Sequence, residues 1–176
     1  SMLTLQFDQN ALKDKNRFEL LITDENELSG LPESARDAAA MLAKSKDKDG
    51  WLFNLSAPSY IPFMRYSDKR DLREKMYREY MSVGNKGDEF DNKDIIKKIV
   101  NIRLEIAQLM GFKNYAEYAL EHTMAKNSAN VYKLLNQLLE AYKPIAINEY
   151  NAVEGFALGT EKENITVMPW DWSYYS

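Results

Sequence analysis

Hydrophobic residues recur at alternating spacings of four and three between Ile95 and Leu109, the strongest periodic pattern in the chain. This spacing places them on one face of an α-helix. Asp91 precedes the run as a candidate N-cap, and Gly111 follows it as a stop signal. The pattern predicts an amphipathic helix with an apolar face available for packing.

Weaker patterns predict helices along most of the remaining chain. They are expected at about 5–20, from Pro32 to Lys46, over 68–81, over 115–120 and from Ser128 onward. Pro58 and Pro62 are expected to interrupt regular structure between the second and third of these, because proline lacks an N–H donor.

Strand signals are few. Trp51, Phe53 and Leu55 alternate with other residues, which predicts a short strand over 51–55, and a second is expected over 164–168. The expected fold class is therefore all-α: mainly helical with one or two very short β-strands. The sequence contains neither an internal repeat nor a low-complexity linker, so residues 1–176 are expected to be a single helical segment.

The composition favours a globular protein and argues against nucleic acids and membranes as partners. Hydrophobic residues make up 45% of the chain and charged residues 28%, which is typical of a soluble globular domain. A net charge of -4 without a basic stripe argues against nucleic acid as a partner. No stretch approaches the roughly 20 apolar residues that cross a bilayer, so we expect no membrane association. Residues 1–2, Ser before Met, are typical of a tag remnant.

The absence of cysteine from the sequence excludes disulfides, thiolate zinc sites and a cysteine nucleophile. It suits a reducing cytoplasm, where we expect the protein to lie. His122 is the single histidine, whereas a zinc hydrolase needs several ligands, usually with two histidines one helical turn apart. We expect a capping or surface role for His122. No catalytic, cofactor-binding or metal-binding residue is predicted in this chain.

Three other motifs favour structural interpretations. Residues 45–50 resemble the start of a calcium loop, but the twelfth position is Ser56 instead of a bidentate Glu, so a solvated turn is expected. The acidic residues of 88–94 could attract a cation, although a loop entering a helix N-terminus accounts for them better. The glycosylation sequons at Asn54 and Asn164 matter only in a secreted chain.

Consecutive segments resemble one family of enzymes across essentially the whole chain. They are 28–33, 49–53, 58–64, 70–74, 91–92, 102–112, 114–118, 124–126 and 169–175. In this order they resemble the zinc metallopeptidase family of thimet oligopeptidase, oligopeptidase A and bacterial peptidyl-dipeptidase. Asp49-Gly50-Trp51-Leu52 and Pro169-Trp170-Asp171-Trp172 look closest to the peptidyl-dipeptidase branch.

The resemblance implies a mostly helical enzyme in which two lobes flank a deep channel that admits short peptides. It also implies a zinc site, His-Glu-x-x-His with a further Glu, downstream of the Trp-Asp-Trp segment. Zinc is therefore expected in the full-length enzyme and not in this chain. Residues 1–176 are expected to be an inactive scaffold and channel wall, with the remainder of the same polypeptide as partner and short peptides as substrates.

Two alternatives remain open. The chain could be a stand-alone helical interaction or regulatory module without catalysis. It could also self-associate artefactually by burying residues 170–175, where four aromatic side chains gather, in a second copy.

Overall fold

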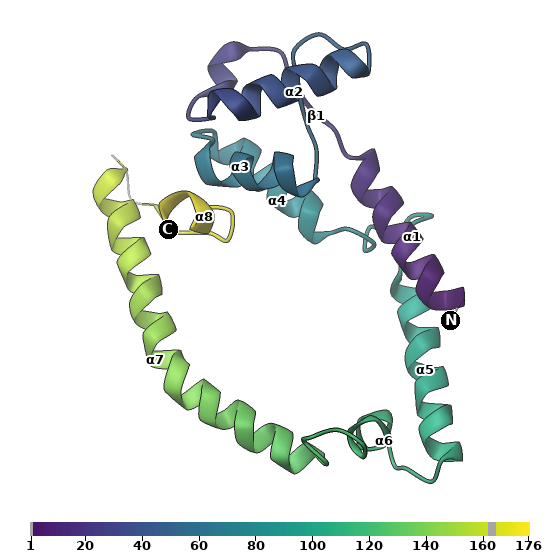
Figure 1. Cartoon of the computed structure of the whole chain (residues 1–176). Coiled ribbons are helices and arrows are strands. Elements are labelled where there is room, and N and C mark those ends of the chain that lie inside the picture. Colours follow the sequence, from purple (N-terminus) through teal and green to yellow (C-terminus); the bar gives the residue numbers. More distant parts are fainter. Residues whose placement is uncertain (1, 162–164) are drawn as a thin grey trace. The chain divides into compact units, whose positions relative to one another are not determined.

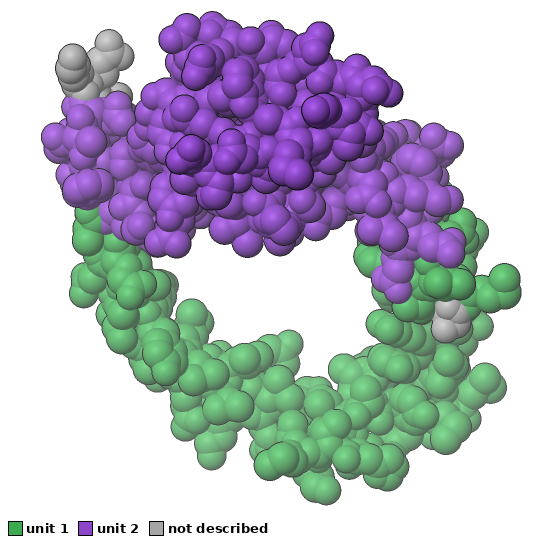
Figure 2. Space-filling view, turned by 45° about the horizontal axis from the view of Figure 1, so that its top comes forward, with its two compact units in different colours: residues 1–7, 93–152 green, residues 8–92, 153–176 purple. Residues whose placement is uncertain are grey.

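The computed structural model describes residues 2–161 and 165–176 (Figure 1). The chain divides into two compact units, drawn in different colours in Figure 2. Unit 1 comprises the described residues of 1–7 and 93–152, and unit 2 comprises 8–92 and the described residues of 153–176.

Helices dominate both units, which confirms the predicted all-α class. In chain order the elements are α1 (Met2–Arg17), β1 (Leu20–Ile22), the 3-10 helix η1 (Glu25–Leu28), α2 (Glu33–Ser45), β2 (Trp51–Phe53), α3 (Ala57–Tyr66), α4 (Arg70–Met81), α5 (Lys93–Leu109), α6 (Tyr115–Leu120), α7 (Ser128–Thr160) and α8 (Trp172–Tyr175). Among the described residues, no helix combines the length and apolar character needed to cross a membrane.

The predicted strand over 51–55 is confirmed as β2, which pairs antiparallel with β1 so that Leu21 faces Leu52 across the sheet. Leu20 and Ile22 are buried while Leu21 is exposed, as alternation along a strand requires. The helix predicted over 5–20 ends earlier than expected, at Arg17, because Leu20 belongs to β1.

The second predicted strand, over 164–168, is wrong in the part that the structure describes. Residues 165–168 are not a strand, and Asn164 lies outside the described residues. Backbone groups in this stretch pair with side chains instead of a neighbouring strand. Arg70 donates to the Thr166 carbonyl at 2.9 Å, and the Met168 N–H donates to Asp171 at 3.0 Å.

The predicted interruption at Pro58 and Pro62 is also wrong, because both prolines lie inside α3. Pro58 occupies the first turn, where a backbone N–H would have no partner within the helix. Pro62 removes one ladder hydrogen bond. The helix nevertheless buries Phe63 and Met64, and the Phe63 ring meets the Phe53 ring edge-on at 4.9 Å. This burial outweighs the lost hydrogen bond.

Unit 2 has its own hydrophobic core. The core brings together residues from both strands, η1, α2, α3, α4, two connecting loops and the segment before α8: Leu20, Ile22, Leu28, Leu31, Ala39, Phe53, Leu55, Phe63, Met64, Met76 and Trp170. Trp170 comes from a distant part of the sequence, so the 165–176 segment completes a core that the earlier elements begin.

A buried carboxylate fixes the second half of α1 within unit 2. Asp14 is fully buried and accepts hydrogen bonds from the Gly84 N–H at 2.7 Å, Lys86 at 3.2 Å and Arg17 at 2.7 Å. These three donors satisfy a charge that would otherwise be costly to bury.

Unit 1 contains α5, α6 and the greater part of α7. The helix predicted from Ile95 to Leu109 is confirmed as α5, and the Phe112 N–H closes it by donating to the Ala107 carbonyl at 2.8 Å beside Gly111, whose φ is 82°. Asn114 caps α6 by accepting from the Glu117 N–H at 2.9 Å. Many apolar side chains of α5 and α7 are exposed to solvent.

Candidate functional site

Three charged side chains of unit 2 form a group that we call the Asp171 cluster: the buried Arg73 and Asp171, and the partly exposed Arg70. Arg70 and Arg73 lie three residues apart near the start of α4 and therefore project to the same side of that helix. Asp171 precedes α8 and is fully buried, and Arg73 is 1% exposed. A buried ion pair of this kind must be well paired to be tolerated.

The hydrogen bonds of the Asp171 cluster satisfy its buried carboxylate. Asp171 Oδ1 accepts from Arg73 Nη2 at 2.9 Å and Arg70 Nε at 3.0 Å. Asp171 Oδ2 accepts from Arg70 Nη2 at 2.7 Å and the Met168 N–H at 3.0 Å. Arg73 donates further to the carbonyls of Ser67 at 2.6 Å and Trp170 at 3.3 Å. The cluster thus ties the 165–176 segment to α4 and to the loop before it.

Tyr174 extends this network. The Cζ atom of Arg73 lies 4.0 Å from the centre of the Tyr174 ring, which is a cation–π contact. The Tyr174 hydroxyl donates to Asp68 at 2.8 Å, and Asp68 also accepts from the Ser29 hydroxyl. These contacts connect the end of η1, the α3–α4 loop and α8.

Burial raises the pKa of Asp171, but hydrogen bonds from Arg70, the Met168 N–H and Arg73 lower it further than burial raises it. The net pKa lies below the ordinary aspartate value. A carboxylate that is ionised and bound by four donors is a poor general base, because a proton would have to displace those donors. The chemistry of the Asp171 cluster is therefore that of a structural anion.

The lowered pKa gives a pH dependence. Because the folded-state pKa of Asp171 is below the unfolded value of about 4, its stabilisation is fully present above that value and is lost as the pH falls through the folded pKa. We expect the difference in unfolding free energy between the parent chain and Asp171→Asn to be constant from pH 5 to 8, and to shrink below about pH 4. Urea titrations from pH 3 to 8 test this; a difference that shrinks near pH 6 contradicts it.

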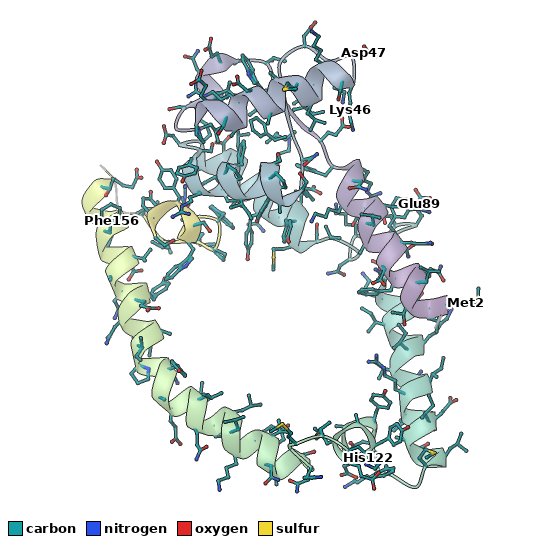
Figure 3. The ribbon with its side chains drawn as sticks, in the orientation of Figure 1. Met2, Lys46, Asp47, Glu89, His122 and Phe156 are labelled. Atoms are coloured by element: carbon teal, nitrogen blue, oxygen red, sulfur yellow. The ribbon has the colours of Figure 1, made fainter. Side chains whose placement is uncertain are left out.

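His122 lies between α6 and α7 in unit 1 (Figure 3). Its side chain is 88% exposed, and its Nε2 atom is 3.6 Å from a Glu121 carboxylate oxygen. Within 2–161 and 165–176, no three His, Cys, Asp or Glu side chains come together as a metal site would require. The described residues therefore do not fit a zinc site.

The calcium-like stretch at 45–50 forms the turn after α2, where Figure 3 labels Lys46 and Asp47. The Ser45 hydroxyl donates to the Leu42 carbonyl at 2.8 Å and belongs to the helix end. Lys46 and Lys48 both form ion pairs with Glu19. Two ammonium groups in this turn disfavour a bound cation, and the expected solvated turn accounts for the residues.

The acidic run forms the loop before α5. Asp88 pairs with Arg17 and accepts from the Phe90 N–H at 3.0 Å, and Asp91 accepts from the Gly87 N–H at 2.6 Å. Asp94 lies in the first turn of α5. Glu89, labelled in Figure 3, is exposed. Hydrogen bonds within the loop thus account for Asp88 and Asp91, in agreement with the structural interpretation.

A pocket of about 270 Å³ lies in unit 2 between α2, β2 and the start of α3. Ala39 and Leu52 contribute to its apolar wall, and Asn54, Ser56 and Ser59 contribute polar groups. Asn54 accepts hydrogen bonds from the N–H and hydroxyl of Ser56, and its own N–H donates to Ser59. These groups mainly satisfy each other, which favours a local turn over a reactive centre.

Sequence reasoning did not identify the Asp171 cluster. Its members come from segments that carried the family resemblance, but they are separated by about 100 residues in the chain. The one available signal was an acidic residue inside an aromatic segment, Trp170-Asp171-Trp172, where burial of a charge demands a cationic partner.

Comparison with known proteins identifies related enzymes. Oligopeptidase A of Haemophilus influenzae is 40% identical over the whole chain, and that of Escherichia coli is 38% identical. Dipeptidyl carboxypeptidase of Escherichia coli is 28% identical over 99% of the chain. The chain spans 26% of the length of each of these relatives.

The identities are higher for the two oligopeptidases A than for the dipeptidyl carboxypeptidase, which differs from the expected nearness to the peptidyl-dipeptidase branch. That expectation rested on two four-residue motifs, which are too small a part of the alignment to rank branches. The sequence profile of Peptidase family M3 matches residues 63–176. This match covers most of the chain, and the oligopeptidase A relatives align with all of it. The chain therefore belongs to peptidase family M3.

Proposed function

We propose that the full-length protein hydrolyses short peptides, and that residues 1–176 supply scaffold and channel wall to it without catalytic or metal-binding residues. Membership of peptidase family M3 is the observation that carries this proposal. The relatives are named oligopeptidase A and dipeptidyl carboxypeptidase, which supports peptides as the substrate class.

The scaffold role is supported by how unit 2 is held together. Its two buried carboxylates, Asp14 and Asp171, each accept from several donors, so both oxygen atoms of each are already hydrogen-bonded and poorly placed for acid–base chemistry. In this proposal the zinc that the family resemblance implies is bound by other residues of the full-length protein. Residues 1–176 are then one segment of a larger cytoplasmic metallopeptidase.

The test compares the full-length protein with the 176-residue chain. We expect the full-length protein to cleave a quenched fluorescent peptide of about ten residues and to lose this activity with a zinc chelator. The 176-residue chain is expected to give no cleavage above the buffer rate. The same peptide sequence placed in a loop of a folded protein is expected to resist cleavage, since a channel excludes it.

Two results would contradict the proposal. Chelator-sensitive cleavage by the 176-residue chain would show that it holds a catalytic site. An inert full-length protein that carries no His-Glu-x-x-His sequence would favour the non-catalytic helical module.

A further inference from the structure

The unit 1 part of α7 carries a continuous apolar face. Its central positions follow one another at alternating spacings of four and three: Val131, Leu135, Leu138, Tyr142 and Ile145. We call these five residues the α7 stripe. The opposite side of the helix carries charged and amide side chains, among them Lys133 and Glu140. A four–three alternation is the spacing with which one helix packs against another.

The α7 stripe is exposed in this chain. Leu135, Leu138, Tyr142 and Ile145 are between 42% and 62% exposed. Single exposed apolar residues are ordinary on protein surfaces, but a contiguous row over four helical turns marks an interaction surface. A row of about 15 residues is about 22 Å long, which matches a partner helix of similar length.

Part of the same side of α7 is covered further along the helix. Val153 lies 18 residues after Leu135, which is five turns at about 3.6 residues per turn, so both project to the same side of α7. In unit 2, Val153 and Ala157 pack with Val167 and Tyr175. Phe156, three turns after Ile145 on the line of the stripe, is 60% exposed, so this covering of the helix is partial.

We propose that the α7 stripe is the docking site of an amphipathic helix from the remainder of the same polypeptide. This inference rests on the proposed function, because it assumes a full-length peptidase. The relatives extend well beyond the matched quarter of their length, so the full-length protein has ample chain to supply such a helix. A helix is the occupant because the four–three alternation fits helix packing.

Thiol labelling in the full-length protein tests the docking. The 176-residue sequence contains no cysteine, so a substitution introduces one reactive position in it. Leu135→Cys and Leu138→Cys place the thiol on the α7 stripe, and Lys133→Cys and Glu140→Cys are matched controls on the opposite side. Labelling by N-ethylmaleimide is followed by mass spectrometry of the peptide that contains each position.

We expect labelling at positions 135 and 138 to be at least tenfold slower in the full-length protein than in the 176-residue chain. Labelling at 133 and 140 is expected to change less than threefold. Variants that do not match the parent in circular dichroism are replaced by Tyr142→Cys, a third stripe position. The labelling requires no peptidase activity. If the stripe is labelled slowly in a full-length protein that has no activity, the docking inference stands and only the proposed function is contradicted.

Two results would overturn the inference. Equal labelling on both sides of α7 in the full-length protein would show that no helix covers the stripe. Slow labelling at 135 and 138 in the 176-residue chain itself would show that the chain or a second copy covers the face. Sedimentation separates those cases, since a second copy doubles the mass.

Discussion

Asp171→Asn is expected to lower the free energy of unfolding of unit 2 by about 3–5 kcal/mol, the cost typical of breaking a buried ion pair from one side. The substitution keeps the shape of the side chain but removes its charge. Arg73, which is 1% exposed, then holds a positive charge in the interior without its carboxylate partner. Arg70 is partly exposed and can recover hydration, so the cost arises mainly from Arg73.

Urea unfolding followed by tryptophan fluorescence measures this effect selectively. The three tryptophans, Trp51, Trp170 and Trp172, all belong to unit 2, so the signal reports on that unit. Glu74→Gln is the control, because it removes the exposed ion pair with Arg78 on the same helix and is expected to cost less than about 1 kcal/mol. Similar losses in the two variants would show that burial of the Asp171 cluster contributes little.

Gly30→Ala is expected to destabilise unit 2 by about 2–5 kcal/mol. Gly30 has a φ of 81°, in the left-handed region, where a side chain costs about 1–2 kcal/mol. A Cβ atom there would lie 2.1 Å from the Tyr66 carbonyl oxygen and 2.6 Å from Asp68 Oδ1. Relief of the overlap must separate two backbone segments, which adds about 1–3 kcal/mol, as overpacking of a core does.

Gly87→Ala separates the two contributions to the Gly30 effect. Gly87 has a φ of 72°, but a Cβ atom there meets nothing within 4 Å. It therefore tests backbone strain without overlap, and we expect a loss of about 1–2 kcal/mol. Equal losses for the two alanine variants, measured by the same urea titration, would show that the loop around Gly30 adjusts freely.

The helices with regular periodicity were predictable from the sequence because their patterns are local. The spacing from Ile95 to Leu109 and the stop at Gly111 located α5, and the helix expected over 115–120 coincides with α6. Strand β1 could not be predicted, since Leu20-Leu21-Ile22 is a continuous apolar run that lacks the alternation found over 51–55. Helix α3 was missed because burial of Phe63 and Met64 overrides the local preference of Pro62.

The candidate site was less accessible to sequence reasoning than the helices. His122 and the calcium-like turn could be assigned structural roles because each lacks ligands that its chemistry would need nearby in the chain. The acidic loop could be assigned one because it enters a helix N-terminus. The Asp171 cluster depends on Arg70 and Arg73 meeting a residue about 100 positions later. A single sequence gives no signal of such a long-range contact. The aromatic residues around Asp171 indicated only that their segment packs against other parts of the protein.

Because unit 2 is built from two separate parts of the chain, its core can be completed only late in synthesis. Residues 8–92 leave the ribosome first, but Trp170 and Asp171 follow only after residues 93–169 have been made. At about 5–20 residues per second, the nascent chain waits roughly 4–16 s with Arg73 and neighbouring apolar side chains uncovered. During that interval the uncovered apolar side chains can bind chaperones or other unfolded chains. Slower translation would lengthen the interval and so favour aggregation.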